Sequence, residues 1–107
     1  MAWTVEALNE VVLAELTALP NDMRAKLEHI ARMIESFGLE RMREPYVKHL
    51  DGALWEMRLI GRDGIARAIY VTAVGKRVVI VRAFRKKTQK TPRSELELAF
   101  KRAKEVT

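Results

Sequence analysis

Apolar residues recur at helical spacing in the first forty positions of the chain, on either side of Pro20. Steps of three and four indicate two consecutive helices, the first carrying Val12, Leu16 and Leu19, and the second carrying Met23, Leu27, Ile30, Ile34 and Phe37. Gly38 follows as a helix terminator. A weak alternation over residues 3–7 indicates a short strand ahead of the helices. We expect the two helices to form an antiparallel hairpin that packs on a sheet.

Strand-like alternation dominates the following segment. In residues 54–60 (LWEMRLI), one face carries Trp55, Met57 and Leu59, and the other carries Leu54, Glu56, Arg58 and Ile60. Two further strands, in residues 65–73 and 77–84, come after short turns and complete a three-stranded meander. Thr91 then predicts an N-cap, with Pro92 as the first residue of a terminal helix.

The order of these elements, β-α-α-β-β-β-α, predicts one α+β domain over residues 1–107. It consists of a small antiparallel, mostly meander sheet, an N-terminal helical hairpin and a C-terminal helix. A chain of 107 residues has the length of a single modest domain.

Composition excludes several classes of protein. The chain has no cysteine, which rules out disulfides, thiolate catalysis and cysteine zinc sites, and it has only two histidines. We therefore expect no metal and no cofactor. No apolar run approaches the roughly 20 residues of a membrane span, and glutamates interrupt the first sixteen residues where a signal peptide would be apolar. We expect a soluble, cytoplasmic protein.

Positive charge is concentrated in the second half of the chain. The first fifty residues hold six Lys and Arg against eight acids, whereas residues 51–107 hold fourteen against six. Such segregation, with a net charge of +6, is typical of a protein that binds a polyanion. Charge that serves only solubility is the alternative.

The predicted strand register collects cations at one place. If Ile60 pairs with Ile65, Arg58 faces Arg67 directly across the ladder, where like charges destabilise a hairpin unless an anion or solvent separates them. A two-residue turn at Gly75-Lys76 would then place Phe84 beside Arg67 and Arg82 beside Ile69. The basic segment 84–92 (FRKKTQKTP) starts at this row, so we expect one continuous patch that suits phosphate groups.

Other interpretations remain open at this point. Glu56, Arg58, Arg67 and Arg82 could form an ordinary solvated surface in which Glu56 pairs with Arg82. His49, in a polar connector, is a lone histidine whose imidazole could act as a base, although a structural role is more common. None of the nucleotide-binding or hydrolase motifs with a fixed glycine pattern occurs.

Residues 46–105 resemble the RelE/ParE toxin superfamily, in particular its phage-derived HigB-like branch. The resemblance rests on "LWEMRLIGRDGIARAIY" and on "VVIVRAFRKKTQKTPRSELELAFKRAKE", which contain a W-E-M-R strand, an arginine-bearing second strand and F-R-K-K-T-Q-K-T-P before a terminal helix. The first 45 residues agree only in element order and in the Gly-to-Pro connector. One extra residue in "DGALWE" departs from the usual pattern.

The resemblance implies a toxin of a type II toxin-antitoxin pair, an mRNA interferase that cuts codons in the ribosomal A site. Cleavage in that superfamily proceeds without a metal, by attack of the ribose 2′-hydroxyl on the adjacent phosphate. Transferred to this sequence, the catalytic residues are Arg58, Arg67, Lys86 and Lys87. The neighbouring cations expected to bind RNA are Arg82, Arg85, Lys90 and Arg93.

The general base is left open by the sequence. Arginine stays protonated at useful pH, so the candidates are a lysine whose pKa is lowered by nearby cations, Glu56 or His49. Some RelE-like members carry a tyrosine near the terminal helix, where this chain has "QKTPRSE" with neither Tyr nor His.

The resemblance also implies a helix-turn-helix, HigA-like antitoxin, besides the 30S ribosomal subunit and mRNA, as partners. Two other functions remain: a non-catalytic basic module that binds nucleic acid, and a ParE-like toxin that acts on DNA gyrase.

Overall fold

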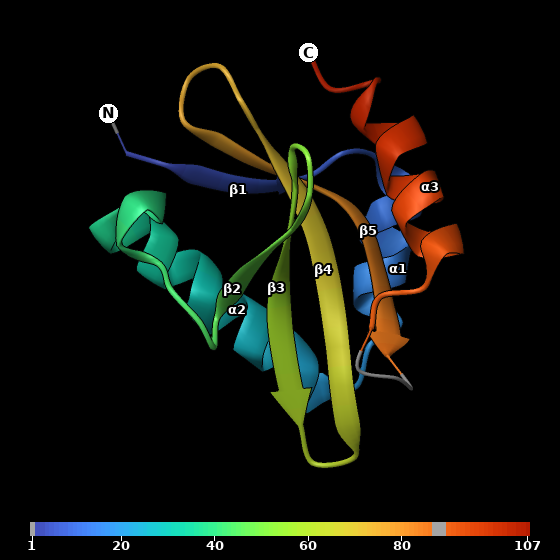
Figure 1. The fold of residues 1–107 in the computed structure, drawn as a ribbon. Coiled ribbons are helices and arrows are strands. Elements are labelled where there is room, and N and C mark those ends of the chain that lie inside the picture. The colour runs from blue at the N-terminus through green and yellow to red at the C-terminus, as the bar shows by residue number, and fades with distance from the viewer. Residues whose placement is uncertain (1, 87–89) are drawn as a thin grey trace.

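The computed structural model describes residues 2–86 and 90–107. Figure 1 shows the arrangement of the elements. They are β1 (Thr4–Ala7), α1 (Glu10–Thr17), α2 (Asn21–Phe37), the 3-10 helix η1 (Leu39–Arg41), β2 (Val47–Asp51), β3 (Leu54–Gly61), β4 (Gly64–Ala73), β5 (Arg77–Lys86) and α3 (Arg93–Ala103). None of the helices in the described part of the chain is long and apolar enough to cross a membrane.

The strands form one five-stranded sheet in the order β1-β5-β4-β3-β2. Neighbouring strands are antiparallel except β1, which pairs in parallel with β5. The sheet and the three α-helices of the described residues confirm the predicted α+β class and element order. Strand β2 is an addition that the sequence pattern did not predict. Only Val47 of its five residues is buried, so the strand lacks a marked apolar alternation.

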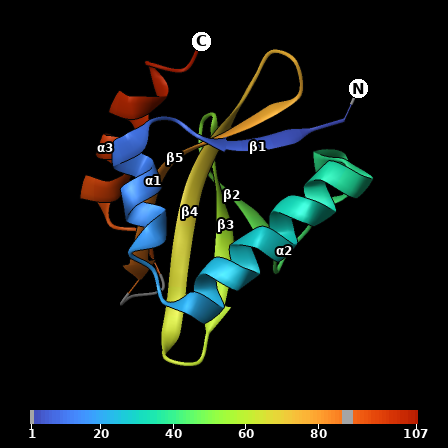
Figure 2. The same cartoon turned by 180° about the vertical axis from the view of Figure 1, so that it is seen from behind.

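The helices cover the two faces of the sheet unequally. Helix α2 crosses one face with α1 beside it, as the view from behind shows (Figure 2), and α3 lies against the other face (Figure 1). The larger core forms on the α1/α2 face, where the buried side chains include Val12, Met23, Ile30, Ile34, Met57, Leu59 and Tyr70. A smaller core beneath α3 includes Leu54, Ile69, Val71, Val79, Val81 and Ala99.

The start of α3 differs from its prediction by one residue. The helix begins at Arg93, Pro92 occupies the N-cap position, and no side chain caps the first turn. The predicted N-cap, Thr91, uses its hydroxyl to donate a hydrogen bond to Glu56 on β3 instead. The helix start is thus attached to the sheet by a side-chain contact.

The predicted strand register is confirmed, although the turn between β4 and β5 is not the predicted one. Ala73 pairs with Arg77, so the turn has three residues, 74–76, rather than two. A β-bulge at Val81, between the Ile80 and Arg82 pairs, then restores the expected register. As a result Arg82 lies opposite Ile69, as predicted.

Candidate active site

Two arginines lie side by side on the α3 face of the sheet. Arg58 of β3 pairs directly with Arg67 of β4, and Arg67 in turn pairs with Phe84 of β5. The register therefore confirms the predicted row of cations. Like charges across a ladder repel each other, so a negative charge close to this row would stabilise it.

Glu56 supplies that negative charge. Its carboxylate is fully buried, and Oε2 forms an ion pair with Nη1 of Arg67, which is itself only 4% exposed. The other carboxylate oxygen, Oε1, accepts a hydrogen bond of 3.2 Å from the Thr91 hydroxyl. Burial lowers the pKa of Arg67 from its ordinary value. Glu56 thus joins β3, β4 and the segment before α3.

Lys86 lies at the end of β5, in the row next to the arginine pair and opposite Ile65. Partial burial, followed by the charges of Arg67, Arg58 and Lys48, lowers the pKa of Lys86 to about 8. At pH 7 about a tenth of such lysines carry a neutral amine. Lys86 can therefore accept a proton near neutral pH. The sequence led us to expect this property for a lysine that lies close to several cations.

Lys48 is a cation of this site that was not predicted from the sequence. It lies on β2 directly opposite Glu56, and its charge is one of those that lower the pKa of Lys86. The signal that would have found it is the edge strand β2 itself, since pairing with β3 brings Lys48 to the α3 face.

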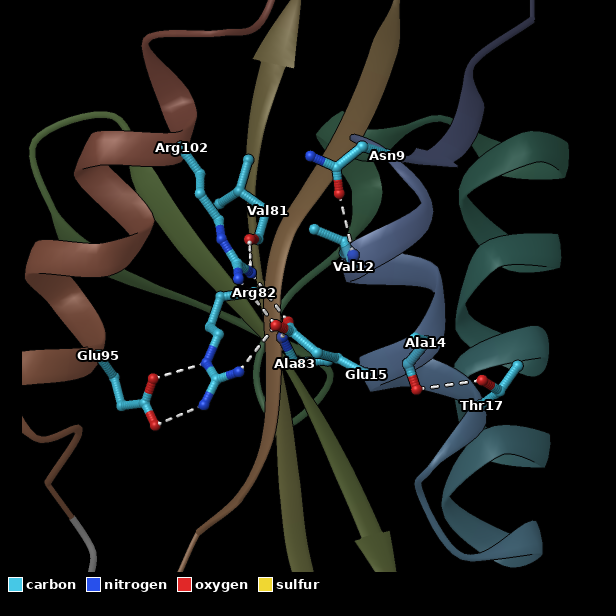
Figure 3. Close-up of polar contacts among 10 residues, drawn as sticks. All are labelled: Asn9, Val12, Ala14, Glu15, Thr17, Val81, Arg82, Ala83, Glu95 and Arg102. Atoms are coloured by element: carbon cyan, nitrogen blue, oxygen red, sulfur yellow. Dashed lines mark hydrogen bonds and ion pairs between the residues drawn. The ribbon is translucent and has the colours of Figure 1, made fainter.

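Arg82 belongs to a separate group of ion pairs (Figure 3). Its Nε and Nη2 donate to the two carboxylate oxygens of Glu95 at 2.6 and 3.0 Å, and its Nη1 is 2.9 Å from Oε2 of Glu15. The guanidinium also lies 5.6 Å from the centre of the Phe84 ring. The alternative that Glu56 pairs with Arg82 is therefore wrong, and two other carboxylates balance the charge that was expected to bind RNA.

The remaining predicted RNA-binding cations are spread over different surfaces. Arg85 pairs with Ala66 and so lies on the opposite face of the sheet, where its Nη2 donates to the Asp63 carbonyl at 3.0 Å. Arg93 is exposed on the first turn of α3, and its Nε lies 3.5 Å from Oε1 of Glu97. Lys90 is exposed. Lys87, which was expected among the catalytic residues and not among these cations, lies outside the described residues.

His49 is separated from the arginine pair by the sheet. It pairs with Trp55, and the two rings meet edge to face with centroids 5.0 Å apart, on the face away from Arg58. Its Nε2 is hydrogen-bonded to the Gly52 carbonyl at 2.8 Å. In this position His49 does not share a surface with the cations of the candidate site. Trp55 lies on the α2 face with Met57 and Leu59, as the strand pattern predicted, but remains 39% exposed.

Residues 2–86 and 90–107 contain no cluster of three or more acidic or histidine side chains able to hold a metal ion. The candidate site in the described residues consists of Glu56, the paired arginines Arg58 and Arg67, and the lysines Lys48 and Lys86. Such a group can bind a phosphate and stabilise extra negative charge on it.

Comparison with known proteins identifies the family of the chain. Residues 14–104 match the family described as "Phage derived protein Gp49-like (DUF891)". The chain belongs to this family. No curated protein matches it significantly.

Two solved structures share the fold. A double arginine-to-alanine mutant of the Escherichia coli toxin RelE in the free state matches with a TM-score of 0.67 and 20% identity, over 95% of this chain and 98% of that one. An archaeal RelE-RelB complex from Pyrococcus horikoshii matches with a TM-score of 0.61 and 22% identity, over 81% of this chain and 98% of that one. The Gp49-like chain thus has a RelE-like fold, and the predicted resemblance to a phage-derived family with this fold is confirmed.

Proposed function

We propose that this Gp49-like protein is the toxin of a type II toxin-antitoxin pair and cuts mRNA on the ribosome without a metal. The observation that carries the proposal is the position of Lys86, a lysine with a pKa of about 8, in the row beside Arg58 and Arg67. The RelE-like fold and the phage-derived family support the same class of protein.

In the proposed reaction Lys86 acts as the general base. Its neutral amine takes the proton of a ribose 2′-hydroxyl, the 2′ oxygen forms a bond to the adjacent phosphorus, and the bond to the 5′ oxygen breaks. The leaving 5′ oxygen takes a proton from water. Arg58 and Arg67 stabilise the negative charge that builds up on the phosphorane, and this favours the transition state over the bound substrate.

The remaining assignments concern the partners of the protein and its contacts with RNA. A RelE-RelB complex is among the structural relatives, and we propose that a small helix-turn-helix, HigA-like antitoxin neutralises this chain. The 30S A site would present the mRNA to the site. Lys87 is proposed to belong to the catalytic group, and the exposed Lys90 and Arg93 are proposed to contact the RNA backbone. Glu56 and His49 are not needed as proton acceptors in this scheme.

The variant Lys86→Arg tests the base directly, since it keeps the positive charge while arginine stays protonated. We expect cleavage of mRNA on purified ribosomes to fall by roughly 100-fold or more, and wild-type cleavage to rise with pH up to about 8. The readout is the mapped 5′ ends of the mRNA, with ribosome-free mRNA run in parallel. Lys101→Arg, on the exposed side of α3, is the matched control.

Arg58→Gln is preferable to Arg67→Ala as an arginine variant. Removing Arg67 would leave the buried Glu56 carboxylate without its counter-ion, which costs about 3–5 kcal/mol of stability, so a loss of activity could not be told from a loss of folding.

Wild-type rates from Lys86→Arg would refute the base assignment. RNA binding without cuts would favour the non-catalytic module, and growth arrest without cuts would favour the gyrase-directed toxin.

A further inference from the structure

The start of α3 is attached to the sheet at two points of the same row. Across the sheet this row runs through Lys48, Glu56, Ile69 and Arg82. Thr91 donates to Glu56 at one end of the attachment, and Glu95 accepts from Arg82 at the other. The buried Ile69 lies between them. The arginine pair, Arg58 and Arg67, forms the adjacent row on the same face.

The two carboxylate oxygens of Glu56 contact different partners. Oε1 accepts from the Thr91 hydroxyl in front of α3, and Oε2 holds Nη1 of Arg67. Because the carboxylate is fully buried, solvent cannot replace a missing partner at low cost. A change at Thr91 is therefore transmitted to the carboxylate that orients the Arg67 guanidinium.

We propose that Thr91 is a positioning residue for the reaction: through Glu56, its hydroxyl holds the Arg67 guanidinium in the orientation that stabilises the transition state. This inference rests on the proposed nuclease function for its effect on rate, but the geometric part stands on the contacts alone. Thr91 does not touch the substrate in this scheme. It lies next to the helix start, so the docking of α3 and the orientation of Arg67 are coupled.

The side chain at position 91 allows a conservative series. Thr91→Val removes the hydroxyl while keeping the shape, and Thr91→Ser keeps the hydroxyl. Thr17→Val is the matched control, because within the described residues the Thr17 hydroxyl donates only to the Leu13 and Ala14 carbonyls of its own helix, α1, and makes no hydrogen bond to Glu56 or Arg67. Each variant is compared with the wild type for mRNA cleavage on ribosomes and for the Nε–H resonance of Arg67 in a ¹⁵N-labelled sample.

We expect Thr91→Val to lower kcat by roughly ten- to a hundredfold, since small displacements of a charge-stabilising group have effects of this size. KM should change less than kcat, because the orientation of Arg67 matters most for the charge of the transition state. The pH at which cleavage rises should change little, since burial, the largest cause of the lowered pKa of Lys86, is not altered. The Arg67 resonance should shift or broaden in Thr91→Val. Both signals should return to wild-type values in Thr91→Ser and remain so in Thr17→Val.

An unchanged Arg67 resonance in Thr91→Val, or a Thr91→Ser variant as impaired as Thr91→Val, would overturn the positioning role. Wild-type protein that cuts no mRNA would count against the proposed function instead, while the resonance would still decide whether Thr91 orients Arg67. If Thr91→Val fails to fold, Thr91→Ala takes its place in both measurements with the same expected and contradicting results.

Discussion

Single residues set the proton affinity of the site. Lys86 is partly buried and near three other cations, and each of these influences disfavours its ammonium form. The buried carboxylate of Glu56 is in direct contact with Arg67, so the site defined above combines one acid with several bases. This excess of positive charge can attract an anion, but the site does not need a bound anion in order to fold.

At this scale Lys48→Gln is expected to raise the pKa of Lys86 from about 8 toward its ordinary value of 10.5. The sign follows from the removal of a positive charge, which makes the ammonium form less unfavourable. The pKa can be measured by NMR titration of ¹³C-labelled lysine, and the rise of cleavage with pH should move to higher pH in parallel. Lys104→Gln near the C-terminus serves as control. An unchanged Lys86 titration would contradict the assigned role of Lys48.

Elements are joined by a second group of charges, shown in Figure 3. Beyond Ile80, strand β5 no longer pairs with β1. Side chains from α1 and α3 form hydrogen bonds with the backbone groups of this free edge instead. The Ala83 amide donates to Glu15 of α1 at 3.2 Å, and Arg102 of α3 donates to the Val81 carbonyl at 2.9 Å. Arg102 also contacts the Glu15 carboxylate at 2.9 Å. Glu15 therefore connects α1, β5 and α3.

Glu15→Gln tests this connection through the pH dependence of stability. Burial by itself would raise the pKa of Glu15, but hydrogen bonds from Arg102 and the Ala83 amide, with the charges of Arg82 and Arg102, lower it below 4.5. A carboxyl whose pKa is lower in the folded state stabilises the fold above its unfolded pKa and loses this effect as the pH falls through the folded value. We expect Glu15→Gln to reduce the free energy of unfolding by about 2 kcal/mol at pH 7.

The difference in stability between wild type and Glu15→Gln should shrink as the pH drops below 4.5. Urea unfolding followed by circular dichroism at several pH values measures it. Glu28→Gln, on the exposed side of α2, should change stability far less at any of these pH values. A difference between wild type and Glu15→Gln that does not depend on pH would mean that the contacts of Glu15 are not electrostatic.

The whole molecule separates its charge along the chain. The first fifty residues, with more acids than bases, build β1, α1, α2 and most of β2, while the basic second half builds the remaining sheet strands and α3. The candidate site lies on the face that α3 partly covers (Figure 1). A polyanion is therefore expected to approach this face, and its binding should depend on salt.

Arg58→Gln is expected to make the salt dependence of RNA binding shallower. The slope of log K against log salt concentration should decrease by about 0.7 for each phosphate of a single strand that the variant no longer neutralises. Fluorescence anisotropy with a labelled single-stranded RNA measures the slope. Arg32→Gln, exposed on α2 at the opposite face, should leave the slope unchanged. Equal slopes for Arg58→Gln and the wild type would show that Arg58 binds no phosphate.

The sequence by itself determined the helices, the meander strands and the row of cations. Period-3.6 and period-2 patterns are local properties, and they placed α2 and the strand that carries Arg58. The pairing of Arg58 with Arg67 also followed from the sequence, because the hairpin turn between β3 and β4 fixes the register. The Arg67–Phe84 pair was right for a different reason, since the bulge at Val81 offsets the longer turn.

Only the tertiary structure decided which charges neutralise one another. The strand pattern allowed Glu56 to lie on a solvated surface, yet it is fully buried in contact with Arg67, and Arg82 contacts Glu15 and Glu95 from two helices. The lowered pKa of Lys86 likewise depends on its burial and on Lys48 from an edge strand that the pattern did not reveal. Residues far apart in the chain make these contacts, and their burial depends on how the helices pack, which local periodicity does not encode.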